Sequence, residues 1–385
     1  MTSSSPRAMR ISAAILLASL AMTLVPLPGN RARSLLRQLR SLEPNHADRE
    51  AHSGGYYLGL IDGSSDTGRD ELSLRLLGKT TDWKSFHEID ATHYLRGDLL
   101  QFELKPNVQE TIFGRAFTTN AQGLRDRPYA MAKPEGTFRI ALLGSSMDMG
   151  WGVGTDETYE NRLEDWLNAH AAKRGLSRKF EVVNFAMAAY SPLHRLESFR
   201  RKARDYQPDL VLYSATMLDS RLLEIHVRNL IVEGIDVHYP FLRDGVAAMD
   251  LTARDAKGDK DVLKNKVRPH LNAIGEATMA DLAMRCRAED LPLAIVIVPR
   301  VGQSDSPDSR GPTVAKIAAA ARSLNLPLLD LSATFDDRDP ARIEIAAWDD
   351  HPNAIGHKLL FEALAHKLVD DVHLYKLIFN SDPPR

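Results

Sequence analysis

The pattern of hydrophobic positions between residues 137 and 331 predicts a series of buried parallel strands. Five short stretches are almost continuously apolar, at residues 138–143, 181–185, 209–213, 293–298 and 326–331. Between and after them lie longer segments with apolar residues at helical spacing, among them residues 156–173, 312–324 and 353–369. Strands that are apolar throughout are typical of parallel sheets covered by helices on both faces. The pattern therefore predicts an α/β domain, with an insertion or lid at residues 220–267, where the alternation is interrupted.

The chain before residue 137 has a different pattern. Residues 85–135 contain short alternating stretches separated by turn residues, which predict a small, mostly β extension. Residues 11–25 form an uncharged apolar run, as long as the longest signal peptide cores (about 7–15 residues) and shorter than a spanning helix (about 20). We expect residues 11–28 to be an N-terminal membrane anchor or a signal peptide, with the rest of the chain extracytoplasmic, in the periplasm or at the cell surface. Four arginines between residues 31 and 40 argue against this orientation, because positive charge favours the cytoplasmic side.

These changes of pattern divide the chain into four parts. Residues 1–30 are expected to form the signal peptide or anchor, and residues 31–136 a stalk and the N-terminal extension. The α/β domain is expected at residues 137–370, followed by a C-terminal tail at residues 371–385.

Composition narrows the class of protein. Of the 385 residues 44% are apolar and 26% charged, which excludes a disordered chain, a collagen-like chain and a polytopic membrane protein. The 49 basic and 51 acidic residues nearly cancel, so the charge gives no support for a nucleic-acid partner. Cys286 is the only cysteine, which excludes an intramolecular disulfide and a Cys-based metal site. We expect Cys286 to be a small buried residue, and we expect no metal and no cofactor.

Two short segments contain residues that could carry chemistry. Ligand sites of parallel sheets form at the carboxyl ends of strands, and the first strand is followed by Gly144-Ser145-Ser146. A serine at such a turn lies near backbone N–H groups that could bind an oxyanion, and the turn lacks the Gly-Lys-Ser/Thr of a Walker A loop. Farther on, Asp349 and His351 precede the predicted last helix, and residues two apart in an extended segment face the same way. Asp349 can therefore orient the His351 ring while Asp350 points away; a metal site at these three residues is the alternative.

Together these segments resemble the SGNH hydrolase superfamily, the GDSL esterases and lipases. Residues 140–153, Ile-Ala-Leu-Leu-Gly-Ser-Ser-Met-Asp-Met-Gly-Trp-Gly-Val, are similar to the first block of that family. Residues 348–357, Trp-Asp-Asp-His-Pro-Asn-Ala-Ile-Gly-His, are similar to its last block, and residues 184–190 and 208–219 fall at its second and third. Residues 117–126 resemble a lead-in of exported members with N-terminal extensions. The resemblance implies a three-layer α/β/α, flavodoxin-like fold.

The resemblance also implies roles for individual residues. Ser146 would be the nucleophile, His351 the general base and Asp349 the carboxylate that orients it. The backbone N–H groups of Ser146 and Ala189 would form the oxyanion hole. We add as expected substrate contacts four residues near these blocks: Ser145, Trp151, Tyr190 and Thr216. For the two aromatic residues, packing at the rim of the site is the favoured role, and stacking on the substrate is the alternative.

Three positions depart from the family pattern. Ser145 stands where the family has an Asp before the nucleophile, and Ala189 where the second block has Gly. Leu218 stands where the third block has an Asn that donates to the oxyanion, and loss of one such donor typically costs about 10²–10³ in rate. The hydroxyl of Ser214 or Thr216 is a candidate to compensate for it.

The sequence as a whole favours an exported serine ester hydrolase that acts on an acyl, chiefly O-acetyl, ester. A cell-surface carbohydrate is the substrate class that family analogy suggests. Two alternatives remain open. One is a carbohydrate O-acetyltransferase. The other is a catalytically degenerate SGNH-like protein that binds a glycan or a partner protein, since Ser145 and Leu218 both depart from the pattern of an active enzyme.

Overall fold

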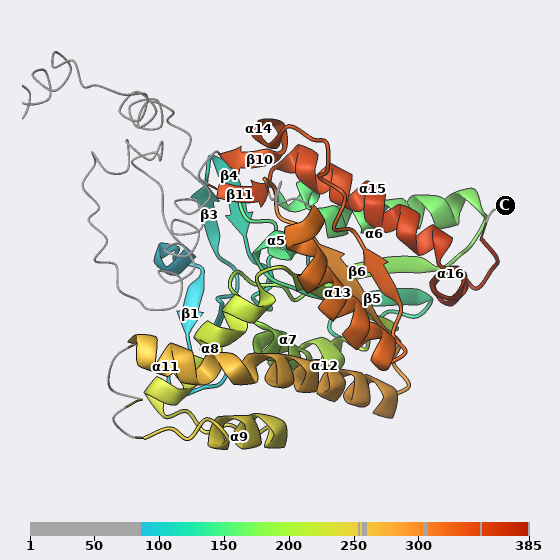
Figure 1. Cartoon of the computed structure of the whole chain (residues 1–385). Helices are drawn as coiled ribbons and strands as arrows, with labels where there is room; N and C mark the ends of the chain where they lie inside the picture. The colour runs from blue at the N-terminus through green and yellow to red at the C-terminus, as the bar shows by residue number, and fades with distance from the viewer. Residues whose placement is uncertain (1–85, 253–254, 256–259, 303–306, 347–348, 384–385) are drawn as a thin grey trace, which may run out of the picture. The chain divides into compact units, whose positions relative to one another are not determined.

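The computed structural model describes residues 86–252, 255, 260–302, 307–346 and 349–383 (Figure 1). The predictions for the apolar run at residues 11–28, for residues 31–85 and for Trp348 lie outside the described residues. Within the described ranges, no helix combines the length and the apolar character needed to cross a membrane.

A five-stranded parallel sheet forms the centre of the α/β domain. Its strands lie in the order β6-β5-β7-β8-β9, and every neighbouring pair is parallel. Numbered along the chain, this is the order 2-1-3-4-5 of flavodoxin-like folds. The strands are β5 (Thr137–Leu143), β6 (Lys179–Asn184), β7 (Leu210–Thr216), β8 (Leu293–Val298) and β9 (Leu328–Asp330). Each overlaps one of the five apolar runs, so the predicted fold class is confirmed.

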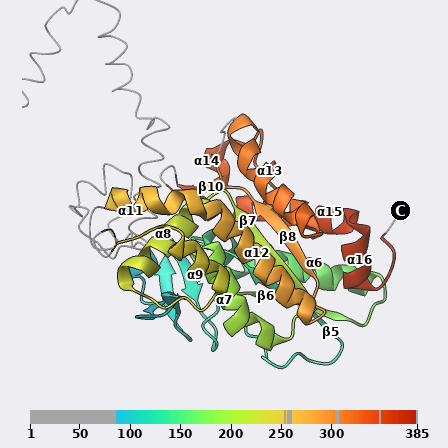
Figure 2. The same cartoon turned by 60° about the horizontal axis from the view of Figure 1, so that its bottom comes forward.

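Helices cover both faces of the sheet, as Figures 1 and 2 show together. Along β5, Ile140 and Leu142 enter one core while Ala141 and Leu143 enter the other, because successive strand residues face opposite sides. The first core is completed by helices α6 (Tyr159–Lys173), α15 (Ala354–Asp370) and α16 (Val372–Phe379). The second is completed by α7 (Pro192–Arg201), α8 (Asp219–Glu233) and α12 (Leu271–Ala288).

Two helical boundaries differ from the sequence-based expectation. Helix α6 begins after Thr158 and not at residue 156, the start of the predicted segment, because the 3₁₀ turn η2 (Thr155–Glu157) precedes it. Residues 372–379, which we placed in a C-terminal tail, form α16. Its apolar side chains are buried in the first core: Leu374, Tyr375, Ile378 and Phe379. Cys286 lies buried on α12 with a free thiol, as expected.

The regular secondary structure in the described part of the N-terminal extension is mainly two antiparallel pairs of short strands, in line with its expected β character. Strand β1 (Thr92–Tyr94) pairs with β2 (Phe102–Leu104), and β3 (Gln109–Ile112) pairs with β4 (Arg115–Thr118). Phe86, Phe102 and Phe117 of this extension share a third core with Trp151 and with residues 186–190. The extension therefore packs on the segments that follow β5 and β6.

The described part of the segment at residues 220–267 is mainly helical. Helix α9 (Pro240–Ala247) contacts α12, and α11 (Lys260–Val267) contacts α8.

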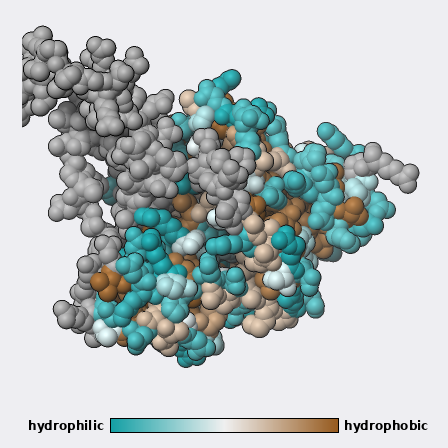
Figure 3. All heavy atoms as spheres, in the orientation of Figure 1, coloured by the Kyte–Doolittle hydropathy of each residue, from teal (hydrophilic) through white to brown (hydrophobic). Residues whose placement is uncertain are grey.

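On the face drawn in Figure 3, hydrophobic residues are interspersed with hydrophilic ones. The remaining short elements and helices are η1 (Phe86–Glu88), α5 (Ser146–Met149), η3 (Ala203–Tyr206), η4 (Arg268–His270), α13 (Pro307–Ser323), α14 (Pro340–Ile343), β10 (Glu344–Ala346) and β11 (Asp349–Pro352).

Candidate active site

The sheet topology brings the separate sequence blocks to one edge. Strand β5 pairs with β6 on one side and with β7 on the other, so the order in which strands are added to the sheet reverses at β5. In open α/β sheets this switch point, at the carboxyl ends of the strands, is where ligands bind. The segments after β5, β6 and β7 carry Ser146, Ala189 and Leu218, respectively.

Ser146, His351 and Asp349 form one hydrogen-bonded chain. Ser146 is the first residue of α5, and His351 and Asp349 lie on β11, which pairs antiparallel with β10. The His351 Nε2 atom is 2.7 Å from the Ser146 hydroxyl oxygen, and its Nδ1 atom is 2.5 Å from Asp349 Oδ1. The side chains are almost fully buried, with exposed fractions of 2% for Ser146 and 1% for His351.

The hydrogen-bond partners determine the tautomer of His351. Asp349 Oδ1 also accepts from the backbone N–H of His351 at 3.2 Å, so this carboxylate oxygen faces two donors of the same residue. A carboxylate only accepts, so Nδ1 carries the proton and Nε2 is left to accept from the Ser146 hydroxyl. Burial by itself raises the pKa of Asp349, but the His351 ring and the two hydrogen bonds from His351 outweigh burial and lower this pKa.

The Trp151 side chain is buried near the Asp349 carboxylate and does not lie at an open surface. It is 1% exposed, and three phenylalanine rings of the N-terminal extension pack edge-on against it: Phe86, Phe113 and Phe117. The indole lies near enough to Asp349 to contribute to its lowered pKa, but among the described residues its N–H has no hydrogen-bond partner of ordinary geometry. In this structure Trp151 is therefore chiefly a packing residue of the third core.

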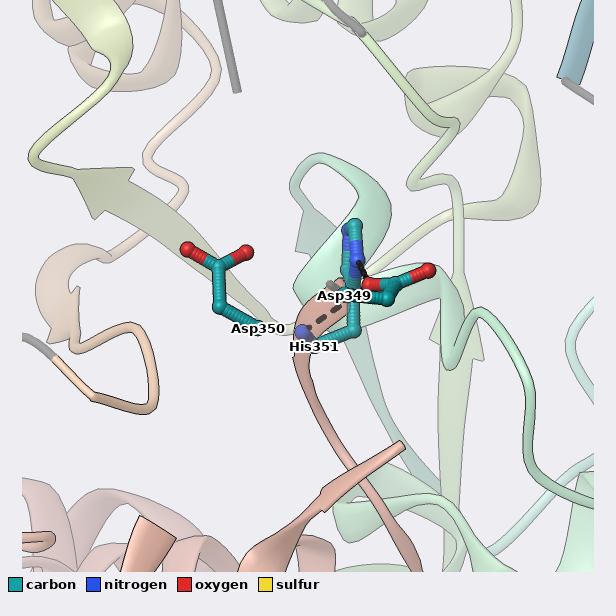
Figure 4. Close-up of side chains that lie close together, drawn as sticks. All are labelled: Asp349, Asp350 and His351. Carbon is teal, nitrogen blue, oxygen red and sulfur yellow. Dashed lines mark hydrogen bonds and ion pairs between the residues drawn. The ribbon is translucent and has the colours of Figure 1, made fainter. Parts of the chain in front are cut away.

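Asp350 points away from Asp349 and His351, as Figure 4 shows and as the alternation along an extended segment predicts. Its carboxylate forms an ion pair with Arg300. Ligand atoms of the three residues lie within 4.8 Å of one another, which by distance could hold a metal ion. However, both ring nitrogens of His351 are engaged, by Asp349 and by Ser146, so the ring offers no unengaged nitrogen to a metal.

Asp148 shapes the turn that presents Ser146, a role that the sequence analysis missed. Its Oδ2 atom accepts from the backbone N–H of Ser145 at 2.7 Å, and its Oδ1 atom accepts from the Tyr159 hydroxyl at 2.6 Å. A side chain at Gly144 would collide with the Asp148 carboxyl group, which explains the glycine. Burial raises the pKa of Asp148 against these hydrogen bonds. Its helical spacing from Ser145, at the third position of α5, was the available sequence signal.

Ala189 adopts a left-handed backbone conformation with a φ of 62°. This is the conformation for which glycine is best suited, consistent with the glycine of the second block. Tyr190, the next residue, is 4% exposed; its hydroxyl donates to the Phe102 carbonyl at 3.1 Å, and its ring stacks on His194. The Tyr190 side chain therefore packs against the extension and α7.

Leu218 lies directly before α8 and is partly buried in the third core. The Thr216 hydroxyl donates to Asp219 Oδ1 at 3.0 Å and accepts from the Leu218 N–H at 3.3 Å. The fully buried Ser214 hydroxyl lies near Asp148 and Tyr159, but it makes no hydrogen bond of ordinary geometry with a described residue. The Thr216 hydroxyl therefore donates its proton to Asp219, and the Ser214 hydroxyl lies among Asp148 and Tyr159.

The lead-in at residues 117–126 is bound to the same loops. Arg125, 1% exposed, donates to the carbonyl of Met149 at 2.6 Å and to that of Val153, both in the turn after Ser146. Asp126 accepts from the backbone N–H of Asn184 at 2.7 Å, at the end of β6. The extension thereby connects the first and second blocks.

Comparisons with known proteins add the following. No protein-family model matches the sequence, and no curated protein matches it. Solved structures with similarity include that of TesA, 13% identical over 60% of this chain and 97% of that one, with a TM-score of 0.39. The acetylxylan esterase Axe2 from Geobacillus stearothermophilus is 16% identical over 60% of this chain and 94% of that one, with a TM-score of 0.39. A two-domain esterase active on acetylated mannans is 15% identical over 65% of this chain and 51% of that one, with a TM-score of 0.36.

Proposed function

We propose that this chain is a serine ester hydrolase of the SGNH type. The observation that carries the proposal is the hydrogen-bonded chain from Ser146 through His351 to Asp349, with distances of 2.7 and 2.5 Å. A nucleophile within hydrogen-bond reach of a base, itself oriented by a carboxylate, is the arrangement that activates a serine.

In the proposed reaction His351 Nε2 takes the Ser146 proton while the serine oxygen attacks the acyl carbonyl carbon. The imidazolium that forms is stabilised by the Asp349 carboxylate, which stays ionised because its pKa is lowered. His351 then returns the proton to the leaving alcohol, and the acyl group remains on Ser146. Water attacks the acyl-enzyme with His351 again acting as base, and the acid is released.

The oxyanion of the tetrahedral intermediate needs donors that are not used elsewhere. No described residue accepts a hydrogen bond from the backbone N–H of Ser146 or of Ala189. We assign these two groups to the oxyanion, with the left-handed φ of Ala189 setting the direction of its neighbouring peptide bonds. Leu218 contributes no side-chain donor, so the proposed hole has two donors where the family has three.

For the substrate we propose an O-acyl ester, with O-acetylated carbohydrate outside the cytoplasm as the class that the sequence resemblance suggests. The location rests on residues 11–28, which lie outside the described residues. Acetyl transfer onto a sugar hydroxyl differs from hydrolysis only in the final acceptor. Acetyl exchange onto an added oligosaccharide is the measurement that separates transferase from hydrolase.

Hydrolysis of p-nitrophenyl acetate by the full chain tests the proposal, with Ser146→Ala and His351→Ala measured beside it. We expect wild type to turn over and both variants to lose about 10³-fold or more in kcat, because each removes a group needed for acylation. Asp350→Asn is the matched control, since Asp350 points away from the site, and it should retain activity. Equal rates for wild type and Ser146→Ala would overturn the proposal and favour the non-catalytic binding alternative.

A further inference from the structure

One buried arginine connects the two loops that flank the proposed oxyanion hole. Arg195 lies on α7, and its side chain has no exposed surface. Its guanidinium donates to both carboxylate oxygens of Asp219, each at 2.8 Å. It also donates to the backbone carbonyl of Tyr190 at 3.1 Å. Asp219 follows Leu218, and Tyr190 follows Ala189, so a single group contacts both loops.

The contact with the second-block loop restrains Ala189. The Tyr190 N–H donates to the Met187 carbonyl at 3.1 Å and closes the turn around Ala189, while Arg195 holds the Tyr190 carbonyl on the other side. The left-handed conformation of Ala189 is unfavourable for a residue with a Cβ atom and persists only where its surroundings hold it. The hydrogen bonds on both sides of Tyr190 supply such a restraint.

The contact with the third-block loop acts through Asp219. Besides binding Arg195, Asp219 accepts from the Thr216 hydroxyl at 3.0 Å, and the Thr216 oxygen accepts from the Leu218 N–H at 3.3 Å. The guanidinium lies over the Tyr213 ring, 5.3 Å from its centroid, which supports it from β7. The loop after β7 is thus anchored to the same group that anchors the loop after β6.

We propose that Arg195 is a positioning residue that holds the Ala189 N–H in the direction needed to bind the oxyanion; this inference rests on the proposed function. The planar fork of a guanidinium can bind a carboxylate with two parallel hydrogen bonds and still donate to a carbonyl, which an ammonium group cannot reproduce. Arg195 touches neither substrate nor Ser146 in this scheme, so it acts on the rate through the geometry of the loop.

The test compares Arg195→Met and Arg195→Lys with a matched control, Arg139→Met. Arg139 is also fully buried and pairs with Glu181, but it lies on β5 among residues that precede the carboxyl end of the sheet. We measure kcat and KM for p-nitrophenyl acetate, inhibition by phenylboronic acid and the melting temperature. The boronate forms a tetrahedral adduct on serine, so its affinity reports the oxyanion donors.

We expect Arg195→Met to lower kcat about 100-fold with little change in KM, since misplacing a catalytic group by about 1 Å costs about that factor. Boronate affinity should fall in parallel, and Arg195→Lys should lie between wild type and Arg195→Met. Arg139→Met should lower the melting temperature while keeping kcat. If Arg195→Met does not fold, Asp219→Asn replaces it, with the same direction expected in kcat and boronate affinity.

The results that would overturn the inference are distinct from those that would overturn the proposed function. Ser146-dependent turnover that stays at the wild-type level in the folded Arg195 variants would overturn the inference alone. A loss that appears equally in Arg139→Met, or that leaves boronate affinity intact, would assign Arg195 a purely structural role. Absence of Ser146-dependent turnover in wild type would instead overturn the proposed function, and the inference with it.

Discussion

At the residue scale, Ala189 and Leu218 are the two positions where side-chain chemistry conflicts with the arrangement around them. Ala189 adopts a φ of 62°, which costs a residue with a Cβ atom about 1–2 kcal/mol. Leu218 places an apolar side chain where the related pattern has a hydrogen-bond donor. The first conflict concerns stability, whereas the second concerns rate, so they can be tested separately.

Replacing Ala189 with glycine should stabilise the protein. We expect Ala189→Gly to raise the free energy of unfolding by about 1 kcal/mol in urea unfolding, because glycine adopts a positive φ without steric conflict. The kcat should stay close to that of wild type, since the N–H is retained. Asp290→Gly, at an exposed position with a φ of 52°, is the control for stabilisation away from the site. A large loss of kcat in Ala189→Gly would contradict the role assigned to its N–H.

Leu218→Asn should raise the rate of Ser146-dependent hydrolysis. The substitution restores a side-chain donor at the third-block position, and such a donor is typically worth about 10²–10³ in rate when well placed. We expect a rise in kcat of about 10-fold or more, measured with p-nitrophenyl acetate. Leu218→Ala removes the same apolar surface without adding a donor and should show no rise. An equal effect of both substitutions would mean that space, not hydrogen bonding, limits the rate.

At the scale of elements, the segment with His351 is held by the start of α15. The Asn353 side-chain oxygen caps this helix by accepting from the N–H groups of Ile355 and Gly356, at 2.9 and 3.2 Å. Its side-chain nitrogen donates to the carbonyls of Arg342 and Glu344, each at 3.0 Å. One side chain therefore connects the helix to β10, against which β11 pairs.

Asn353→Ala should lower both stability and activity. Loss of an N-cap typically costs about 1–2 kcal/mol of unfolding free energy, and here the connection to β10 is lost as well. Asp371→Ala removes the comparable cap of α16, where Asp371 accepts from the His373 and Leu374 N–H groups at 3.0 Å. We expect both variants to melt at lower temperature but only Asn353→Ala to lose kcat. Equal activities of the two folded variants would show that β11 keeps its position without this contact.

At the scale of the whole molecule, buried polar groups connect the N-terminal extension, the sheet and α6. Asn184, at the end of β6, donates to Glu160 Oε1 and to the Asp148 carbonyl, each at 2.8 Å, while its backbone N–H donates to Asp126. Glu160 is fully buried, and burial raises its pKa to about 7 despite its hydrogen bonds. The stability of the molecule should therefore depend on pH through this carboxyl group.

The sign of that dependence follows from proton binding. Between the usual Glu pKa, about 4.5, and about 7, the folded state keeps the Glu160 proton that the unfolded chain has lost. This contribution to stability thus falls as the pH rises through that window, by about 1.4 kcal/mol per pH unit at most.

Glu160→Gln removes this dependence and keeps an oxygen for Asn184. We expect the free energy of unfolding of Glu160→Gln, relative to wild type, to rise between about pH 5 and pH 7 and then to level off. Urea unfolding at several pH values measures it. Glu362→Gln, at an exposed position on α15, is the control for removing one carboxylate from the chain. A constant difference for Glu160→Gln would contradict the raised pKa.

The order of strands and helices follows from local pattern. Runs that are apolar throughout, at β5 and β8 for example, are typical of strands buried on both faces of a parallel sheet, so this pattern together with the intervening helices indicated the fold class. The spacing of Asp349 and His351 likewise determined that both side chains face one way along β11. Helix termini were less certain, since Thr158 rather than Thr155 precedes α6. Such boundaries depend on which of several nearby residues is covered by neighbours.

The contacts between segments distant in sequence were decided only by the tertiary structure. The distance of 2.7 Å between Ser146 and His351 joins residues that are 205 positions apart, and the sequence could suggest it only through family resemblance. The roles of Asp148, Arg125 and Arg195 depend on which carbonyls and carboxylates the packed loops present to them, and no local pattern encodes those partners. The sequence by itself therefore determined the strands, their burial and the types of residue available for chemistry. The packing of the three cores determined which of those residues meet, because burial leaves each polar group only the partners within hydrogen-bond reach.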